Sequence, residues 1–279
     1  MRTLLPYITS GLATGTIYAL AALGVAIVYK GSGVLNFAHG SIATVGVLVF
    51  ARLSGDVPVG VAVLVGVLAG VLLGIASDIL VFRPLQAESE ATKVMASVAL
   101  LSFLQAIILP LFEGRFLRLF PTTVIRAGGF FIGVDQLLVI MITVVLTIAL
   151  VAFFRGNSWG IAIRAVADDP ASTALLGVAP ARVSAVAWGL GGGLAALSGI
   201  LLAPFISQDP ILLTLIVIHA MAAAVVGALE SLPLVVAGAL GLGLVESVGS
   251  RERARRRKAS APPRMMTSAG QPSVKRWIM

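Results

Sequence analysis

Long apolar runs dominate this chain. Five stretches of at least 19 residues contain no Asp, Glu, Lys or Arg: 3–29, 57–77, 94–112, 136–154 and 183–208. A helix of roughly 20 apolar residues crosses the ~30 Å hydrocarbon core of a bilayer. Each run therefore predicts a membrane-spanning helix.

Three further segments are apolar but shorter or interrupted. Residues 210–229 are interrupted by His219, 231–245 are uncharged, and 40–51 form a run of only 12 residues. The last of these either extends backwards through 33–39 or dips into the membrane and returns. Together the eight segments predict an all-α integral membrane protein, a polytopic bundle of about eight transmembrane or re-entrant helices within residues 1–250.

Glycines recur at four-residue spacing inside these runs. The repeats are Gly11 and Gly15; Gly66, Gly70 and Gly74; and Gly189 and Gly193. Helices in lipid gain little from burying apolar surface against each other, so small residues that allow close backbone approach supply the packing. These repeats predict extensive helix–helix contact, with packing inside the chain favoured over contact with a second chain.

The composition agrees with a membrane protein, and the charge is concentrated at one end. Charged residues make up 11% of the chain and its mean hydropathy is +1.04. Soluble domains are about 25% charged. The whole net charge of +8 lies in residues 251–279, which hold 9 basic residues and 1 acidic residue. We therefore expect a basic, disordered tail at 251–279 and no nucleic-acid-binding fold.

Several kinds of chemistry lack their residues here. The chain has no Cys, which excludes disulfides and thiol catalysis. It has no Gly-x-x-x-x-Gly-Lys-Ser/Thr motif, so it contains no phosphate-binding loop of that type and is not itself an ATPase. Its two histidines do not form a recognisable metal-binding pattern. We expect no enzyme activity, no catalytic residue, no metal and no cofactor on this chain.

The order of the segments makes a prediction about topology. If the 155–182 connection is cytoplasmic, then 83–93 is also inside, while 113–136 and the N-terminus are outside. If 210–229 and 231–249 both cross, the Arg-rich block after Ser250 is outside, against the positive-inside rule. Three explanations remain open: one segment re-enters without crossing, the tail is an exception, or the tail is a truncated or non-native end.

One informative segment lies between the first two apolar runs. It reads Gly33-Val34-Leu35-Asn36-Phe37-Ala38-His39-Gly40. Irregular backbone at membrane depth survives where protein or a water-filled cavity satisfies it. The segment is either a broken element that lines a path, with Asn36 and His39 as hydrogen-bonding groups, or a polar turn at the membrane interface.

A second informative segment lies in the 155–182 connection. Asp168 and Asp169 precede Pro170, a pattern that predicts a capped helix over 170–176 ended by Gly177. Ala171, Ala174, Leu175 and Val178 fall on roughly one face of it. Such a short amphipathic helix either docks a soluble partner or lies on the membrane surface.

At these two segments the chain closely resembles the permease subunits of ATP-binding-cassette importers for branched-chain amino acids. The carriers of the resemblance are the first span around Gly11–Gly24, the Gly33–Gly40 motif, the Arg164-Ala165…Asp168/Asp169…Ala174…Gly177 pattern, and Ala222–Gly227 with Ser231-Leu232-Pro233. The resemblance covers about residues 3–249, and the chain is similar to the first of the two permease types that pair in such importers.

The resemblance implies a multi-pass protein of the bacterial cytoplasmic membrane that moves Leu, Ile, Val or related small amides by alternating access. The implied partners are a second homologous permease, two cytoplasmic ATP-binding subunits, an external solute-binding protein and membrane lipid. It implies that Asn36, Phe37 and His39 lie in the translocation path. It also implies that Arg164, Ala165, Asp168, Asp169, Pro170, Ala174 and Gly177 form an ATPase-coupling loop.

Two alternatives remain at this stage. A stand-alone secondary transporter or channel for a small polar solute would draw on ionisable groups inside the spans. The candidates are Asp78, His219, Glu230 and Glu246. A membrane scaffold with a lipid-binding tail would instead depend on 251–279.

Overall fold

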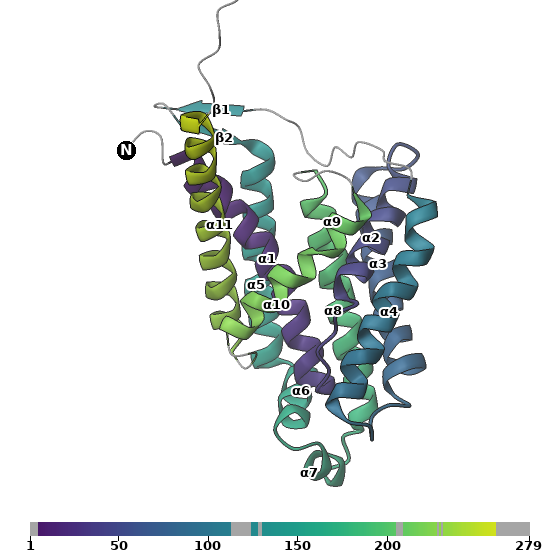
Figure 1. The fold of residues 1–279 in the computed structure, drawn as a ribbon. Helices are drawn as coiled ribbons and strands as arrows, with labels where there is room; N and C mark the ends of the chain where they lie inside the picture. Colours follow the sequence, from purple (N-terminus) through teal and green to yellow (C-terminus); the bar gives the residue numbers. More distant parts are fainter. Residues whose placement is uncertain are drawn as a thin grey trace, which may run out of the picture.

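The computed structural model describes residues 5–112, 124–127, 130–204, 209–227, 229 and 231–260. These residues form an elongated helical bundle (Figure 1). Its elements are α1 (Leu5–Ser32), α2 (His39–Leu53), α3 (Val59–Ser77), the π-helix η1 (Asp78–Phe82), α4 (Glu90–Leu111), β1 (Val124–Ala127), β2 (Phe130–Gly133), α5 (Val134–Gly156), α6 (Ser158–Asp168), α7 (Pro170–Leu175), α8 (Pro180–Leu202), α9 (Pro210–Thr214), α10 (Ile216–Val226) and α11 (Leu232–Ser260).

All eight predicted membrane segments are helical. Among the described residues, six helices are long and apolar enough to cross a bilayer: Thr9–Ser32, Val59–Phe82, Glu90–Leu111, Leu137–Gly156, Pro180–Leu202 and Leu232–Gly249. Two shorter apolar helical stretches, His39–Leu53 and Pro210–Val226, complete the set. The all-α polytopic prediction is confirmed, although the predicted 183–208 run ends as a helix at Leu202.

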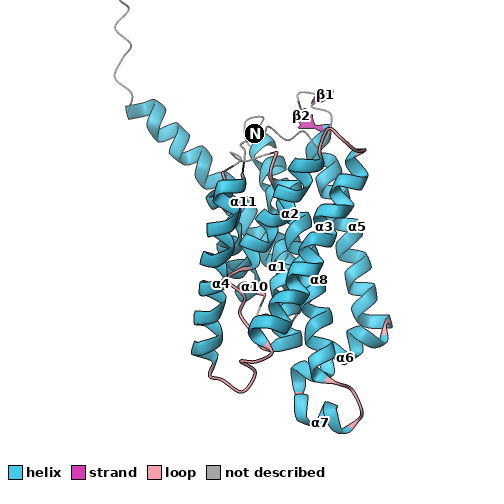
Figure 2. Cartoon of the chain, turned by 90° about the vertical axis from the view of Figure 1, so that its right-hand side faces the viewer, coloured by secondary structure: helices cyan, strands magenta, loops and turns pink. Residues whose placement is uncertain are grey.

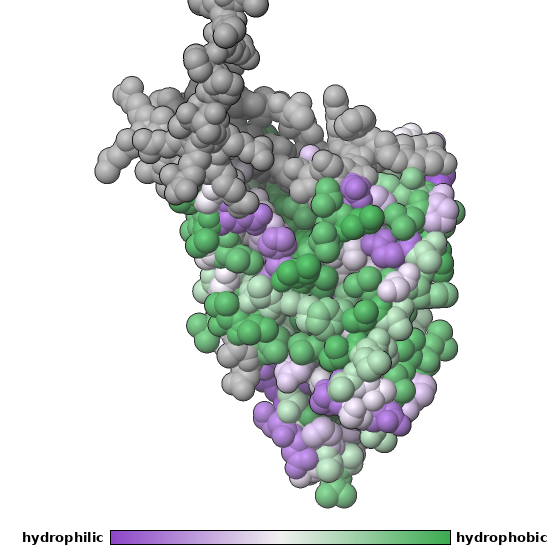
Figure 3. Space-filling view, viewed as in Figure 1, coloured by the Kyte–Doolittle hydropathy of each residue, from purple (hydrophilic) through white to green (hydrophobic). Residues whose placement is uncertain are grey.

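The bundle is built around two central helices. Most of α1 and α8 is buried, whereas α3, α4 and α5 each expose most of their apolar surface. Exposed leucines, isoleucines and valines along these outer helices suit contact with lipid chains. Figure 3 shows the corresponding apolar band around the middle of one face, with more hydrophilic residues toward the α7 end.

The glycine repeats form the contacts between these helices. A Cβ at Gly70 would lie 2.5 Å from the Gly192 carbonyl oxygen, and a Cβ at Gly74 would lie 2.2 Å from the Trp188 carbonyl oxygen. Real Cβ atoms do not tolerate such distances, so α3 and α8 touch backbone to backbone only because these positions are glycine. The packing lies within the chain, as the favoured interpretation predicted.

Alternating crossings give the bundle two faces. The start of α1, the β1–β2 hairpin and the end of α11 lie on one face, which we call the N-terminal face (Figures 1 and 2). The connection from η1 to α4 lies with α6 and α7 on the opposite face, which we call the α7 face. In Figure 1, α9 and α10 run from the upper half of the bundle toward the α7 face, and α11 returns to the N-terminal face. This path differs from the explanation in which one of the last segments re-enters without crossing.

Two local features differ from the sequence predictions. A two-stranded antiparallel hairpin, β1–β2, lies within the 113–136 connection. The β-branched residues Val124 and Ile125 ahead of a Gly-Gly pair are a hairpin signal that the search for apolar runs overlooked. In addition, α11 continues through Ser260, past the predicted boundary of the disordered tail at 251. Arg, Glu, Lys and Ala favour helix, which accounts for the extension; residues 261–279 lie outside the described residues.

Candidate translocation and coupling site

The segment between α1 and α2 is a break in the membrane-embedded part of the bundle. Gly33 ends α1 with φ of +72°, a conformation that favours glycine. The chain is then non-helical up to the turn at Phe37 and Ala38, and α2 begins at His39. This geometry agrees with a broken element at membrane depth rather than a polar turn exposed at the interface.

Asn36 and His39 lie deep inside this break. Both side chains are buried, and the amide atoms of Asn36 have no hydrogen-bond partner among the described residues. The ring nitrogens of His39 make no hydrogen bond of normal geometry there, and their nearest acceptor is the Ala21 backbone. Phe37 is half-buried, and its backbone N–H donates to Ser97 Oγ of α4 at 3.3 Å. Buried polar groups are normally paired, so these two neighbouring side chains make the segment a candidate site for water or a polar solute.

The position of His39 depends on glycine in α1. A Cβ at Gly24 would lie 2.6 Å from His39 Cε1 and 3.1 Å from the Gly191 carbonyl oxygen of α8. The imidazole therefore occupies space that exists because Gly24 has no side chain. The start of α2 is equally tight, since a Cβ at Gly40 would lie 2.0 Å from the Thr214 carbonyl oxygen of α9.

A polar cluster that the sequence analysis missed continues from this segment along α2. Thr44 of α2 and Thr214 of α9 have their hydroxyl oxygens 3.0 Å apart. Gln105 of α4 donates from Nε2 to the same Thr214 hydroxyl and, at 3.4 Å, to the Pro210 carbonyl. These residues are far apart in sequence and each sits in an apolar run, so only the recurrence of Thr and Gln inside spans could have indicated them.

The predicted coupling segment forms two short helices. Asn157 caps α6 by accepting from the Trp159 N–H at 2.9 Å. Asp169 caps α7, with Oδ1 accepting from the N–H groups of Ala171 at 2.9 Å and Ser172 at 3.1 Å. Gly177, with φ of +84°, follows α7. The predicted helix start, its carboxylate cap and the glycine stop are confirmed, and Asp169 rather than Asp168 is the cap.

Electrostatics reinforce this cap. The hydroxyl of Ser172 donates to Asp169 Oδ2 at 2.5 Å. This hydrogen bond, together with those from the backbone N–H groups, lowers the pKa of Asp169 below its ordinary value because each favours the ionised form.

The two helices are attached to the bundle very differently. α6 buries Ile163 and Val166, and a Cβ at Gly160 would lie 2.5 Å from the Phe154 Cα of α5, so α6 is seated firmly on its neighbours. α7 projects beyond the rest of the bundle (Figures 1 and 2). Its end exposes Leu175 by 89% and the following Leu176 by 83%. Arg164, Asp168, Asp169, Pro170, Ala174 and Gly177 are also exposed, and Ala165 is half-buried.

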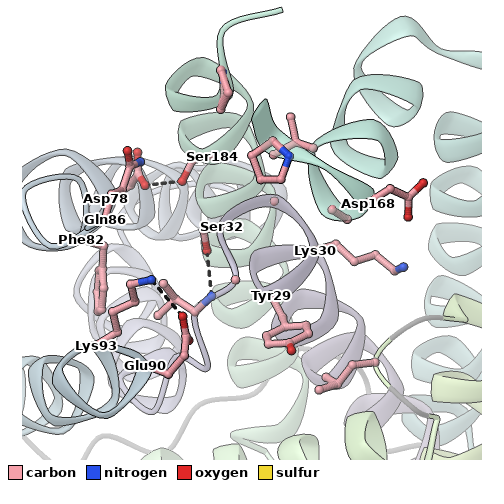
Figure 4. Close-up of a pocket in the computed structure, with 18 of the residues that line it drawn as sticks. Tyr29, Lys30, Ser32, Asp78, Phe82, Gln86, Glu90, Lys93, Asp168 and Ser184 are labelled. Carbon is pink, nitrogen blue, oxygen red and sulfur yellow. Dashed lines mark hydrogen bonds and ion pairs between the residues drawn. The ribbon is translucent and has the colours of Figure 1, made fainter. Parts of the chain in front are cut away.

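A cavity of about 760 Å³ joins the two informative segments. Tyr29–Val34 at the end of α1 line one side of it, and Arg164, Asp168 and Pro170 of the coupling segment line another. Figure 4 shows Lys30 and Asp168 at this cavity, with the Lys93–Glu90 ion pair on the far side. Asn36 and His39 are not among its lining residues, so they lie deeper in the bundle than the cavity.

The ionisable candidates inside the spans have separate surroundings. Asp78 is buried and accepts hydrogen bonds from Ser184 at 2.5 Å and Arg83 at 3.3 Å. Glu246 accepts a hydrogen bond from Tyr18 at 3.0 Å and lies 3.9 Å from His219. Glu230 lies outside the described residues. Within the described part of the chain, no group of three or more His, Asp or Glu side chains is placed to hold a metal ion.

Comparisons with known proteins agree with this architecture. Residues 7–254 match the family model described as branched-chain amino acid transport system / permease component. The chain is 28% identical over 262 residues to the high-affinity branched-chain amino acid transport system permease protein LivH of Salmonella typhimurium, covering 86% of this chain and 84% of the relative. It is 28% identical over 265 residues to LivH of Escherichia coli K12, with 86% and 84% coverage.

A third relative has a different name and the same description. It is the high-affinity branched-chain amino acid transport system permease protein BraD of Pseudomonas aeruginosa, 27% identical over 267 residues, with 88% of this chain and 86% of the relative covered. No solved structure matches the chain significantly. The relatives are components of transport systems, which agrees with a transporter rather than an enzyme. With the model match across most of its length and six candidate spans, the chain belongs to the family of branched-chain amino acid transport permease components, and it is a multi-pass protein of the cytoplasmic membrane.

Proposed function

We propose that this chain is the membrane permease subunit of an ATP-binding-cassette importer that moves branched-chain amino acids or related small amides inward by alternating access. The observation that carries the proposal is the link between α7 and the α1–α2 break. α7 projects from the bundle, and the segment that bears it lines the same cavity as Tyr29–Val34. A push on α7 therefore acts next to the break.

The coupling role rests on α7 and its mounting. Leu175 and Leu176 form an exposed apolar end on a helix whose start is held by Asp169 and Pro170. A soluble subunit that grips this end would transmit motion through α6, which is fixed to the core by Ile163 and Val166. We assign Arg164, Ala165, Asp168, Asp169, Pro170, Ala174 and Gly177 to this coupling loop.

The path role rests on the unpaired polar groups of the α1–α2 break. Asn36 and His39 carry buried polar atoms without hydrogen bonds of normal geometry to the described residues. A second conformation that exposes them to water or to a polar solute would pair those atoms. Phe37, which lies between them in sequence, would act as an apolar gate. We therefore assign Asn36, Phe37 and His39 to the translocation path.

The partners follow from the same assignment. A second homologous permease forms the other half of the path, two ATP-binding subunits grip the coupling loops on the α7 face, and a solute-binding protein delivers cargo at the N-terminal face. ATP is bound and hydrolysed on the partner subunits.

Reconstitution of the chain with its partner permease, ATP-binding subunits and solute-binding protein in proteoliposomes tests the proposal. We expect uptake of labelled leucine that requires internal ATP and external solute-binding protein. Uptake by the chain alone that is abolished by a protonophore would support a stand-alone secondary transporter instead. A complete system that moves no branched-chain amino acid and no small amide would overturn the cargo assignment.

A further inference from the structure

Three ionisable or aromatic side chains from distant parts of the chain meet between α1, α10 and α11. Tyr18 Oη donates to Glu246 Oε2 at 3.0 Å, and His219 Nε2 lies 3.9 Å from the same oxygen. The Tyr18 and His219 rings stack with their centroids 4.9 Å apart. We call these three residues the Tyr18–Glu246 cluster.

Close helix packing brings the cluster together. A Cβ at Gly243 of α11 would lie 2.5 Å from the Gly11 carbonyl oxygen and from the Gly15 Cα of α1. Side chains on helices lean toward the helix N-terminus, so Tyr18 leans toward Gly15 and Glu246 leans toward Gly243. The phenol and the carboxylate therefore meet where the two antiparallel backbones touch.

The cluster lies inside the apolar band but is not sealed from its surroundings. Gly15 is about 9 Å from the Thr9 end of its span, at 1.5 Å per residue, so the cluster sits in the half of the membrane nearest the N-terminal face. The Glu246 side chain is 44% exposed and that of His219 is 38% exposed, whereas Tyr18 is only 6% exposed. Figure 3 shows hydrophilic residues interrupting the apolar band near the region where Figure 1 labels α1 and α11.

A half-exposed carboxylate at this depth costs free energy when it faces lipid, so we expect it to face a water-filled or protein-lined space. Tyr18 satisfies only one carboxylate oxygen and fixes its orientation. Among the ion pairs of the described residues, Glu246 has His219 as its basic neighbour and neither Lys nor Arg. Among the described side chains, the carboxylate therefore lacks a Lys or Arg that donates hydrogen bonds to it.

We propose that the Tyr18–Glu246 cluster is a binding site for the ammonium group of the transported amino acid as it enters from the N-terminal face. Glu246 accepts hydrogen bonds from the ammonium, and Tyr18 and His219 hold the carboxylate in place. The proposal rests on the function proposed above and specifies which part of the cargo the permease itself recognises. A neutral amide without an amino group is not retained at this site.

Direct binding to the assembled importer in lipid nanodiscs, without ATP and without the solute-binding protein, tests the site. The probe is labelled L-leucine, with two competitors that each lack one charge: 3-methylbutylamine, which keeps the ammonium, and 4-methylpentanoate, which keeps the carboxylate. We expect saturable leucine binding that the amine displaces at lower concentration than the acid does. Glu246→Gln is expected to weaken leucine binding at least tenfold, and Tyr18→Phe about threefold.

Glu88→Gln is the matched control, because it makes the same chemical change at an exposed position on the α7 face. It should bind leucine as the unaltered complex does. Wild-type affinity in Glu246→Gln, or no saturable leucine binding in the unaltered complex, would overturn the proposal. Uptake driven by ATP and the solute-binding protein, measured on the same preparation, reports separately on the proposed function.

Recovery of the intact complex is measured for each variant, because Glu246→Gln could fail to assemble. In that case leucine binding is compared in Glu246→Asp and Tyr18→Phe instead. Weakened leucine binding in these two would support the site. Unchanged binding in both, with the partner permease lost only from Glu246→Gln, would show that Glu246 pairs with a cation of that subunit and would overturn the ammonium site.

Discussion

Asp78 Oδ1 accepts a hydrogen bond from the Ser184 hydroxyl at 2.5 Å, although the two residues are 106 positions apart. The other carboxylate oxygen accepts from Arg83 at 3.3 Å, and Arg83 also donates to the Ala181 carbonyl at 3.2 Å. The contacts join η1, at the end of the third helix, to the start of α8 beside the cavity. Asp78 therefore fixes two walls of that cavity relative to each other.

Removing this carboxylate should destabilise the bundle. We expect Asp78→Ala to lower the free energy of unfolding by about 2–3 kcal/mol, less than the ~3–5 kcal/mol of a fully buried pair because the Arg83 side chain is 39% exposed. Ser184→Ala, which removes one hydrogen bond, should cost about 1 kcal/mol. Denaturant titration in detergent measures both, and an Asp78→Ala protein as stable as wild type would show that the contacts contribute nothing.

Two substitutions at Asp169 test the cap of α7: one removes the hydrogen-bond acceptor, and the other removes only the charge. Asp169→Ala should fray α7 and lower ATP-driven uptake, while Asp169→Asn keeps an acceptor and should retain most of the uptake. Hydrogen exchange over residues 169–176 reports the fraying directly. Equal exchange and equal uptake in the two variants would contradict a capping role.

The same cap has a defined pH dependence. The pKa of Asp169 is lowered from an ordinary value of 3.8 by its hydrogen bonds with Ser172 and Ala171. Its stabilising effect is therefore complete above the ordinary value and is lost as the pH falls through the lowered value. We expect exchange protection of α7 to be constant from pH 5 to 8, and a loss of protection within that range would contradict this assignment.

The exposed end of α7 should hold the ATP-binding subunits. Changing Leu175 and Leu176 together to Ser should abolish co-purification of those subunits, because both side chains are almost fully exposed and contribute little to the fold. Changing both to Met keeps an apolar end and should retain the complex. Unaltered co-purification of the Ser variant would move the docking surface elsewhere on the α7 face.

Backbone contact at the start of α2 predicts a sharp difference between two glycines. Gly40→Ala should destabilise the protein by several kcal/mol, because the added Cβ would meet the Thr214 carbonyl oxygen at 2.0 Å. Gly60→Ala, in α3 with nothing within 4 Å of the new Cβ, should be neutral or stabilising by up to about 1 kcal/mol. Thermal unfolding of the two variants compares them, and similar midpoints would contradict the close approach.

Stability and transport should separate at Asn36. Its amide atoms are buried and have no hydrogen-bond partner among the described residues, so Asn36→Leu, of similar size, should leave stability unchanged or raise it by about 1–2 kcal/mol. If Asn36 lines the path, the same change should reduce uptake at least tenfold. A stable variant with full uptake would remove Asn36 from the path, and an unstable one would show that the amide is structural.

The order of apolar runs along the chain was sufficient to predict the helices. Uninterrupted apolar stretches of about 20 residues are satisfied in a bilayer as helices, so the five long runs were accessible from local pattern. The capped start of α7 at Asp168 or Asp169 and the stop at Gly177 were accessible in the same way, whereas the three shorter or interrupted segments left crossing and re-entry open. The charge-rich end of α11 and the β1–β2 hairpin also carried local signals, namely the helix propensity of Arg, Glu, Lys and Ala and the Val124-Ile125 pair ahead of Gly-Gly. Both were missed because they lie outside the apolar runs on which the prediction of elements rested.

Contacts between distant segments were decided by the tertiary structure. The sequence singled out Asn36, His39, Asp78 and Glu246 as separate polar positions, but not that Asp78 is paired with Ser184 or that Glu246 meets Tyr18. Glycine repeats predict close helix packing but do not identify the partner helix. Polar groups in lipid form hydrogen bonds across helices, and the order of residues in the sequence does not reveal which helices these are. The sequence by itself determined a polytopic permease-like bundle with a short capped helix after Pro170. Packing at Gly15, Gly70 and Gly243 decided which of its polar side chains meet.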